Sequence, residues 1–239
     1  MFVELQNVSY YYGDICAIDD LSFCCQKGEV VGLIGSNGAG KSTTIKTLVR
    51  YLKPSSGHIL IDGKDAFSYD QSYPVSYLPD TPVFFDELSV LEHLQFMKAV
   101  YPNNNVSIET MLTQLELGAH QNKIPFALSK GTKQKLMIAI SLLKDYELLI
   151  ADEPFTGLDP TQIAQLKRVF LQQKACGKTV ILSSHLLDVV ENICDRFVMI
   201  QCGKVIASGT RSELLQDAGL DVVRGSLEDV YLKLRNDNE

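Results

Sequence analysis

The sequence of 239 residues lacks a hydrophobic run long enough to cross a membrane. Its longest uncharged apolar stretch is Leu136 to Leu143, whereas a transmembrane helix needs about 18 or more consecutive apolar residues. No basic segment leading into an apolar core follows Met1, so we also expect no secretory signal peptide. These absences predict a protein that stays in the cytosol.

Clustered positive charge is also missing. The chain has 22 Lys and Arg residues against 29 Asp and Glu, which gives a formal net charge of -7. Because binding to nucleic-acid phosphates needs clustered Lys and Arg, this composition argues against nucleic acid as a partner. No CxxC pair is present either, so we expect no zinc site or disulfide and interpret the six cysteines as buried, reduced thiols: Cys16, Cys24, Cys25, Cys176, Cys194 and Cys202.

Short apolar runs alternate with helical patterns along most of the chain, and 46% of all residues are hydrophobic. Such runs, flanked by turn residues, are typical of strands buried on both faces. Their alternation with helices predicts an α/β fold around a largely parallel sheet. The predicted strands are Val30–Ile34, Val75–Leu78, Leu148–Ala151 and Val180–Leu182.

Other segments surround this predicted core. Two strands, residues 2–8 and 17–25, precede it around a turn at Gly13-Asp14, and residues 197–207 suggest a closing hairpin. Between the strands at 75–78 and 148–151 lies a stretch with helical patterns, in which Ser89 and Glu92 form a capping box. We therefore predict an inserted helical lobe at about residues 86–144, and a further helix after Thr210 with Leu227, Val230 and Leu234 on one face.

A glycine-rich segment matches the phosphate-loop pattern GxxxxGK[ST]: Gly35-Ser36-Asn37-Gly38-Ala39-Gly40-Lys41-Ser42. It lies between a predicted strand and a predicted helix, as the pattern requires, which argues against a chance glycine turn. Its glycines let backbone N–H groups surround phosphate oxygens, and the helix adds the positive end of its dipole. Lys41 would bind the terminal phosphates, the Ser42 hydroxyl would ligate Mg²⁺, and Thr43 would touch a phosphate.

Polar side chains follow two later strands. Asp152 and Glu153 come directly after the strand at 148–151, and His185 follows the strand at 180–182. Because ligands gather at the carboxyl ends of parallel strands, we expect these side chains at the same edge as the phosphate loop. Asp152 would hold Mg²⁺, Glu153 would polarise the attacking water, and His185 would sense the γ-phosphate or the water. A solvated acidic turn and an ordinary histidine remain the alternatives.

Several motifs together resemble the nucleotide-binding subunits of ABC transporters. They are the phosphate loop, Leu128-Ser129-Lys130-Gly131-Thr132-Lys133-Gln134, Asp152-Glu153-Pro154-Phe155-Thr156-Gly157-Leu158-Asp159 and His185, in this order. The resemblance implies a P-loop NTPase (RecA-like) core with an N-terminal antiparallel β subdomain and an inserted α-helical subdomain. On this basis residues 1–239 form a single ABC ATPase domain, with core and β subdomain at about 1–85 and 145–215, helical subdomain at about 86–144 and a tail at about 216–239.

The resemblance also implies residue roles. Tyr12 resembles the aromatic residue that stacks on adenine, although Tyr11 is an alternative. Ser129 and Gly131 resemble the signature motif, which presents a helix N-terminus to the γ-phosphate bound by a partner subunit. Asp159 resembles the acid that joins the two sites across the dimer interface, and it is equally suited to cap the helix that begins at Pro160.

Two departures from the family pattern matter. The signature is usually LSGGQ, and Lys130 and Thr132 stand here in place of Gly and Gln, a variant that resembles subunits of ABC-2-type exporters. Asp80 occupies the position of a Gln that normally touches Mg²⁺. Because a carboxylate is a stronger magnesium ligand than an amide, we predict that Asp80 contacts the metal directly or through water. The segment Leu78-Pro79-Asp80-Thr81-Pro82 further resembles the Ecs-type branch of the family.

The resemblance predicts an ATP- and Mg²⁺-dependent ATPase that works as a pair, identical or paralogous, and drives a separate integral membrane permease. Its place would be cytoplasmic, peripheral on the inner face of the cell membrane, and export would be the direction of transport. Phe84 and Phe85 are candidates either for the permease groove or for packing within the lobe. A non-transport ABC ATPase acting on ribosomes or nucleic acid is the alternative, whereas a GTPase is disfavoured because no Asn-Lys-x-Asp segment is evident.

Overall fold

The computed structural model describes residues 1–237 and contains two sheets. The larger has six strands in the order β10-β9-β3-β8-β7-β6. The β10–β9 pair is antiparallel, and the other neighbouring strands are parallel. Its strands are β3 (Val30–Ile34), β6 (Val75–Leu78), β7 (Leu148–Ala151), β8 (Thr179–Ser184), β9 (Arg196–Gln201) and β10 (Lys204–Gly209). Every residue of β3, β7 and β8 is buried, in keeping with the apolar runs from which these strands were predicted, and their parallel pairing confirms the predicted sheet.

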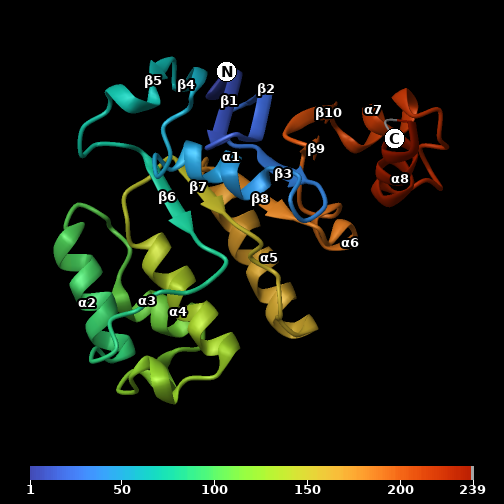
Figure 1. Ribbon diagram of the computed structural model, residues 1–239. Coiled ribbons are helices and arrows are strands. Elements are labelled where there is room, and N and C mark those ends of the chain that lie inside the picture. The colour runs from blue at the N-terminus through green and yellow to red at the C-terminus, as the bar shows by residue number, and fades with distance from the viewer. Residues whose placement is uncertain (238–239) are drawn as a thin grey trace.

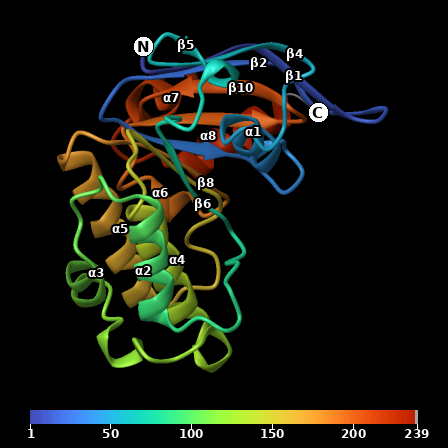
Figure 2. The ribbon, with the colours of Figure 1, turned by 90° about the vertical axis from the view of Figure 1, so that its left-hand side faces the viewer.

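A four-stranded antiparallel sheet covers one side of this core (Figure 2). Its order is β2-β1-β4-β5, from β1 (Val3–Tyr12), β2 (Ile15–Cys25), β4 (Ser56–Ile61) and β5 (Lys64–Asp65). The turn between β1 and β2 lies at Gly13-Asp14 as predicted, and Gly13 takes the positive φ of 58° that favours glycine there. The sequence analysis missed β4 and β5. Strand β4 begins with three exposed residues and buries only Ile59 and Ile61, while neither of the two residues of β5 is buried.

Helices α2, α3 and α4 form a lobe below the sheets in Figures 1 and 2. They are α2 (Val90–Val100), α3 (Ile108–Gln114) and α4 (Lys130–Leu142), with short 3₁₀ turns η2 (Gly118–His120) and η3 (Pro125–Ala127) between α3 and α4. The predicted capping box is present, because Ser89 accepts from the N–H of Glu92 while the Glu92 carboxylate accepts from the N–H of Ser89. The lobe helices therefore begin where their local sequence directs.

The remaining helices flank the large sheet (Figure 1). They are α1 (Lys41–Leu48), α5 (Pro160–Ala175), α6 (Leu187–Val190), α7 (Arg211–Asp217) and α8 (Leu227–Asp237), with a 3₁₀ turn η1 (Ala66–Ser68). On α8, Leu227 and Val230 are fully buried and Leu234 packs against the same core, as their spacing predicts. The tail expected at 216–239 extends past this helix to 238–239, which lie outside the described residues.

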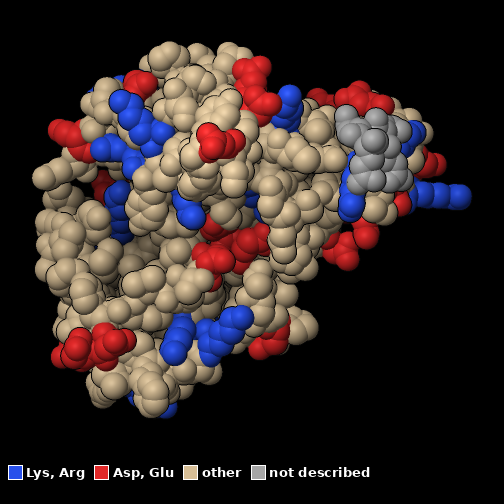
Figure 3. All heavy atoms as spheres, viewed as in Figure 1, with Lys and Arg blue, Asp and Glu red and all other residues tan. Residues whose placement is uncertain are grey.

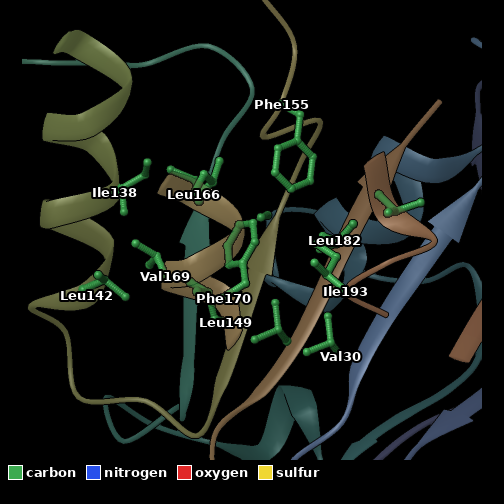
Figure 4. Close-up of a cluster of buried hydrophobic side chains, with 14 of the residues drawn as sticks. Val30, Ile138, Leu142, Leu149, Phe155, Leu166, Val169, Phe170, Leu182 and Ile193 are labelled. Carbon is green, nitrogen blue, oxygen red and sulfur yellow. The ribbon is translucent and has the colours of Figure 1, made fainter. Parts of the chain in front are cut away.

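A cluster of apolar side chains joins the helical lobe to the sheet through α5 (Figure 4). Phe155 and Phe170 meet edge to face with ring centroids 5.8 Å apart, and both are almost fully buried. Ile138 and Leu142 of α4 pack on one side of α5, and strand residues such as Leu182 lie on the other. Because Phe155 directly follows Asp152-Glu153-Pro154, this cluster fixes the chain next to the predicted carboxylates.

Within residues 1–237 no helix combines the length and the apolar character that a membrane span requires. Figure 3 shows basic and acidic side chains interspersed over one face, in keeping with the mixed composition. All six cysteines are free in the structure, but only Cys25 is fully buried, so the prediction of burial was wrong for most of them. Cys16 and Cys24 are exposed on the edge strand β2, Cys176 at the end of α5 and Cys202 in the turn between β9 and β10.

Substitution of Phe170 by Ala should lower the free energy of unfolding by about 3–5 kcal/mol, because it removes the ring from a closely packed cluster and leaves a cavity. Denaturant unfolding followed by circular dichroism measures the change. Phe126→Ala is the matched control, since Phe126 is 92% exposed and its loss should change stability by about 0.5 kcal/mol or less. Equal unfolding midpoints for the two variants would contradict the assigned role of the cluster.

Candidate nucleotide-binding site

The phosphate loop connects β3 to α1 at the carboxyl edge of the large sheet. A cavity of about 260 Å³ opens beside it, and Asp80 and Glu153 arrive there from the ends of β6 and β7. The lining residues are Ala17, Ser36, Asn37, Gly38, Gly40, Lys41, Ser42, Thr43, Asp80 and Glu153. The sheet thus brings together the loop and two of the predicted acids, as the strand order requires.

Two glycines of the loop are needed for close approach. A Cβ on Gly35 would lie 2.4 Å from the carbonyl oxygen of Ile200, which rules out any side chain there without movement of β9. Gly40 has a φ of 109°, and a Cβ on it would lie 2.8 Å from the carbonyl oxygen of Ala17. The loop is therefore seated against neighbouring backbone in a conformation that only glycine adopts without strain.

Lys41 is 5% exposed and is held by three oxygens. Its Nζ donates to the carbonyl oxygens of Gly35 at 2.7 Å and Ser36 at 3.2 Å, and it forms an ion pair of 3.2 Å with Oε1 of Glu153. A buried ammonium group is stable only when such partners replace its water. The lysine side chain is thus folded back on its own loop.

Glu153 bridges two of the predicted residues. Its Oε2 lies 2.8 Å from Nδ1 of His185, while its Oε1 faces Lys41. Its backbone N–H donates to the Ser183 hydroxyl at 2.8 Å, and its φ of 45° is in the left-handed region that non-glycine residues rarely adopt. Strain of this kind costs about 1–3 kcal/mol and is common at functional sites.

Asp152 is 5% exposed and accepts two hydrogen bonds at Oδ1, from the Ser183 hydroxyl at 2.7 Å and from the Ser42 hydroxyl at 3.2 Å. Burial raises the pKa of its carboxyl group, the bonds from Ser183 and Ser42 act in the opposite direction, and the nearby Asp80 and Glu153 raise it further. An uncompensated negative charge is therefore costly at this position, and a cation would relieve that cost.

The sequence places this site in a known family. A family model for ABC transporters matches residues 18–156. The chain belongs to the ABC transporter family. It is 37% identical over 227 residues to the ABC-type transporter ATP-binding protein EcsA of Bacillus subtilis (strain 168), an alignment that covers 92% of this chain and 91% of EcsA. This result confirms the predicted Ecs-type resemblance.

Two further comparisons agree. The chain is 33% identical over 208 residues to the SkfA peptide export ATP-binding protein SkfE of the same organism, which covers 85% of this chain and 87% of SkfE. A solved ATP-binding subunit of an ABC transporter matches with a TM-score of 0.89 at 35% identity, covering 98% of this chain and all of that one. The predicted fold is thereby confirmed, and the chain is an ATP-binding ABC transporter ATPase.

The ABC signature lies away from the cavity of its own chain. Ser129 caps α4 by accepting from the N–H of Thr132, and neither Ser129 nor Gly131 lines the phosphate-loop cavity. Gly131 has a local reason to be glycine, because a Cβ there would collide with the side chain of Gln162. One chain therefore presents a phosphate loop and a signature helix that do not meet in a single cavity.

Asp159 and Tyr12 have ordinary structural surroundings in the single chain. Asp159 caps α5 in a capping box with Gln162, so its predicted capping role is confirmed, while its role between two sites stays a prediction. Tyr12 is 44% exposed, meets the ring of Tyr10 edge to face at 4.9 Å and does not line the cavity. Its stacking on adenine, or that of Tyr11, also stays a prediction.

Two residues of the site escaped the sequence analysis. Ser183 contacts both Asp152 and the backbone of Glu153, and its position at the end of β8, two residues before His185, was a usable signal. Tyr231 of α8 accepts a hydrogen bond from the backbone N–H of Ser36, and no local motif marks it. Both contacts link segments that are distant in the sequence.

Substitution of Asp152 by Asn should stabilise the nucleotide-free protein by about 0.5–2 kcal/mol at neutral pH, since it removes a buried charge beside two other acids while keeping an acceptor for Ser183. The folded-state pKa is raised, so the folded protein binds this proton more tightly than the unfolded chain. The wild-type penalty is therefore full above the folded pKa and disappears as pH falls below about 4.

Thermal unfolding of both proteins between pH 4 and pH 8, in buffer free of nucleotide and divalent metal, measures this difference. We expect the advantage of the Asn variant to shrink as the pH falls. A difference that stayed constant across this range, or grew toward acid pH, would contradict the assigned burial of the charge.

Proposed function

We propose that the chain is the ATP-hydrolysing subunit of an exporter, that it acts in a head-to-tail pair, and that it drives a separate membrane permease from the cytoplasmic face of the cell membrane. The observation that supports this proposal best is the position of Glu153. This carboxylate stands between Lys41 and His185 at the rim of the phosphate-loop cavity. A general base must lie within reach of a phosphate-bound water, and no other acid in the cavity has this pair of neighbours.

In the proposed reaction Glu153 accepts the proton of the attacking water. In the structure its two oxygens are engaged by Lys41 and His185. The triphosphate would draw Lys41 away from Gly35, Ser36 and Glu153, because phosphate oxygens are stronger acceptors for an ammonium group than carbonyl oxygens are. This movement frees one oxygen of Glu153 for the water, while His185 holds the other.

Magnesium is part of the proposal. Among residues 1–237 no three His, Cys, Asp or Glu side chains are grouped closely enough to hold a metal by themselves. Mg²⁺ in nucleotide sites normally uses one or two protein ligands together with phosphate oxygens and water, so the small donor set fits this ion. Ser42 and Asp152 would hold it, with Asp80 beside them, and the ion would neutralise charge on the phosphates.

The signature residues do not line the phosphate-loop cavity of their own chain, and this separation supports pairing of two subunits. Ser129 and Gly131 begin α4, a helix of 13 residues whose N-terminus adds a partial positive charge. Ser129 is exposed, and its own chain offers it no phosphate-loop cavity. In the pair, Ser129 and Gly131 of one subunit would close over the γ-phosphate held by Lys41 of the other, and Asp159 would lie near the shared interface.

The permease contact is assigned to the loop after β6. Phe84 packs partly into the lobe and meets the His93 ring at 5.5 Å, so core packing accounts for it. Phe85 is 55% exposed and meets the ring of Phe96, which is 46% exposed, edge to face at 5.4 Å, so the two rings form an exposed apolar patch. This patch follows Asp80 in the chain, so a permease bound there would be connected to the nucleotide cavity. SkfE is named as a peptide export ATP-binding protein, and this likeness supports export as the direction of transport.

A Glu153→Gln protein should bind ATP but hydrolyse it about 10²–10⁴-fold more slowly than wild type, because the amide cannot take the proton. It should also accumulate as a dimer in ATP, seen by size-exclusion chromatography with light scattering. Glu147→Gln is the matched control: Glu147 lies just before the opposite end of β7, where it pairs with Lys27 and Lys178, and its loss should leave turnover unchanged. Rapid hydrolysis by the Glu153 variant would refute the assigned base.

Affinity purification of the tagged chain from detergent-treated membranes of its native cells tests the partner. We expect an integral membrane protein to co-purify with wild type. Phe85→Ser should reduce its yield about tenfold or more, because an aromatic side chain that the permease would bury is lost. Val223→Ser is the control, since Val223 is equally apolar and 88% exposed but lies near the C-terminus. Recovery of ribosomes instead of a membrane protein would favour the alternative function.

A further inference from the structure

The C-terminal helix touches the phosphate loop through one phenol group. Tyr231 of α8 accepts a hydrogen bond of 2.9 Å from the backbone N–H of Ser36, which lies 195 positions earlier in the chain. Tyr231 does not line the phosphate-loop cavity. Tyr231 would therefore affect ATP binding through its contact with the phosphate loop and not through a contact with ATP.

The bonded N–H belongs to the first peptide unit of the loop. The same planar unit ends in the carbonyl of Gly35, which accepts a hydrogen bond of 2.7 Å from Nζ of Lys41. One rigid peptide plane is thus held at its amide end by Tyr231 and at its carbonyl end by the phosphate-binding lysine. A rotation of this plane would move the Lys41 acceptor and the loop residues that follow it.

Other hydrogen bonds hold the later part of the loop. The Ala39 N–H donates to the Ser36 carbonyl at 3.1 Å, and the Ala39 carbonyl accepts from the N–H of Gly203 in the turn between β9 and β10. Within residues 1–237 the N–H of Ser36 donates to no backbone carbonyl, and its acceptor is the side-chain hydroxyl of Tyr231. The phenol therefore completes the set of anchors at the point where the loop leaves β3.

The structure around α8 holds the phenol in place. Leu227 and Val230 are fully buried, so the face that precedes Tyr231 is fixed against the core. Arg211 donates to the carbonyl oxygens of Val222 and Gly225 in the segment that leads into α8, and it also pairs with Glu191. Tyr231 is thus supported by packing and by charge-assisted hydrogen bonds, which limits the entropy lost when it binds the loop.

We propose that Tyr231 is a positioning residue for ATP binding, which orients the Gly35–Ser36 peptide so that the phosphate loop is preorganised before nucleotide arrives. Ser36 is exposed, and water can replace the phenol when it is removed, so the loss concerns order in the loop rather than folding. The effect should therefore appear in nucleotide affinity. Turnover at saturating ATP should be nearly unaffected, because the phenol is not part of the reacting groups.

Tyr231→Phe tests this proposal, because it deletes the hydroxyl and keeps the ring that packs against the core. We expect the Kd for ATP with Mg²⁺, and the KM, to rise roughly two- to tenfold, with kcat within about twofold of wild type. In the nucleotide-free protein, hydrogen exchange at the Ser36 amide should become faster. Tyr146→Phe is the matched control, since its hydroxyl bonds the Gln173 side chain away from the cavity.

Three results would overturn the proposal. The first is an unchanged Ser36 exchange rate in Tyr231→Phe. The second is an ATP affinity equal to that of Tyr146→Phe, which would mean that loss of a tyrosine hydroxyl has no specific effect at this position. The third is a fall in kcat with unchanged KM, which would place Tyr231 in the reaction itself. All three are measured on the isolated chain, so they remain informative whether or not a permease is identified.

Discussion

The buried ion pair between Lys41 and Glu153 is the interaction on which the rest of the site depends. An ammonium group removed from water needs partners, and Lys41 finds them in one carboxylate and two carbonyl groups of its own loop. These partners keep the lysine beside the phosphate-loop cavity. They also give the proposed base a counter-charge, so arrival of the triphosphate and release of Glu153 become one event in the proposed mechanism.

The fold supports this arrangement by placing groups that lower its stability at one edge of a well-packed sheet. Glu153 has a left-handed backbone, and Asp152 is a buried acid whose pKa is raised by burial and by neighbouring acids. Neither feature favours stability. The Phe155 and Phe170 cluster lies directly behind them and supplies apolar burial where the chain must hold an unfavourable conformation. The predicted site residues Asp152 and Glu153 thus lie only a few positions before Phe155, which stabilises the fold.

The same edge connects to distant parts of the molecule. Asp80 leads from the cavity into the exposed patch of Phe85, and Tyr231 joins the loop to α8. The lobe therefore offers a path toward the proposed permease, while the C-terminal helix, in the proposed role of Tyr231, would preorganise the phosphate loop for ATP. The two connections use different residues, so substitutions at Phe85 and at Tyr231 can test them separately.

The sequence by itself determined the strands from 30 to 34, 75 to 78 and 148 to 151, the phosphate loop and the caps at Ser89 and Asp159. These features depend on contacts within a few residues, so local composition encodes them. Only the tertiary structure decided that His185 meets Glu153, that Ser183 supports Asp152 and that Tyr231 reaches Ser36. Those pairs join segments from 31 to 195 positions apart, and the order of strands and the docking of α8 bring them together.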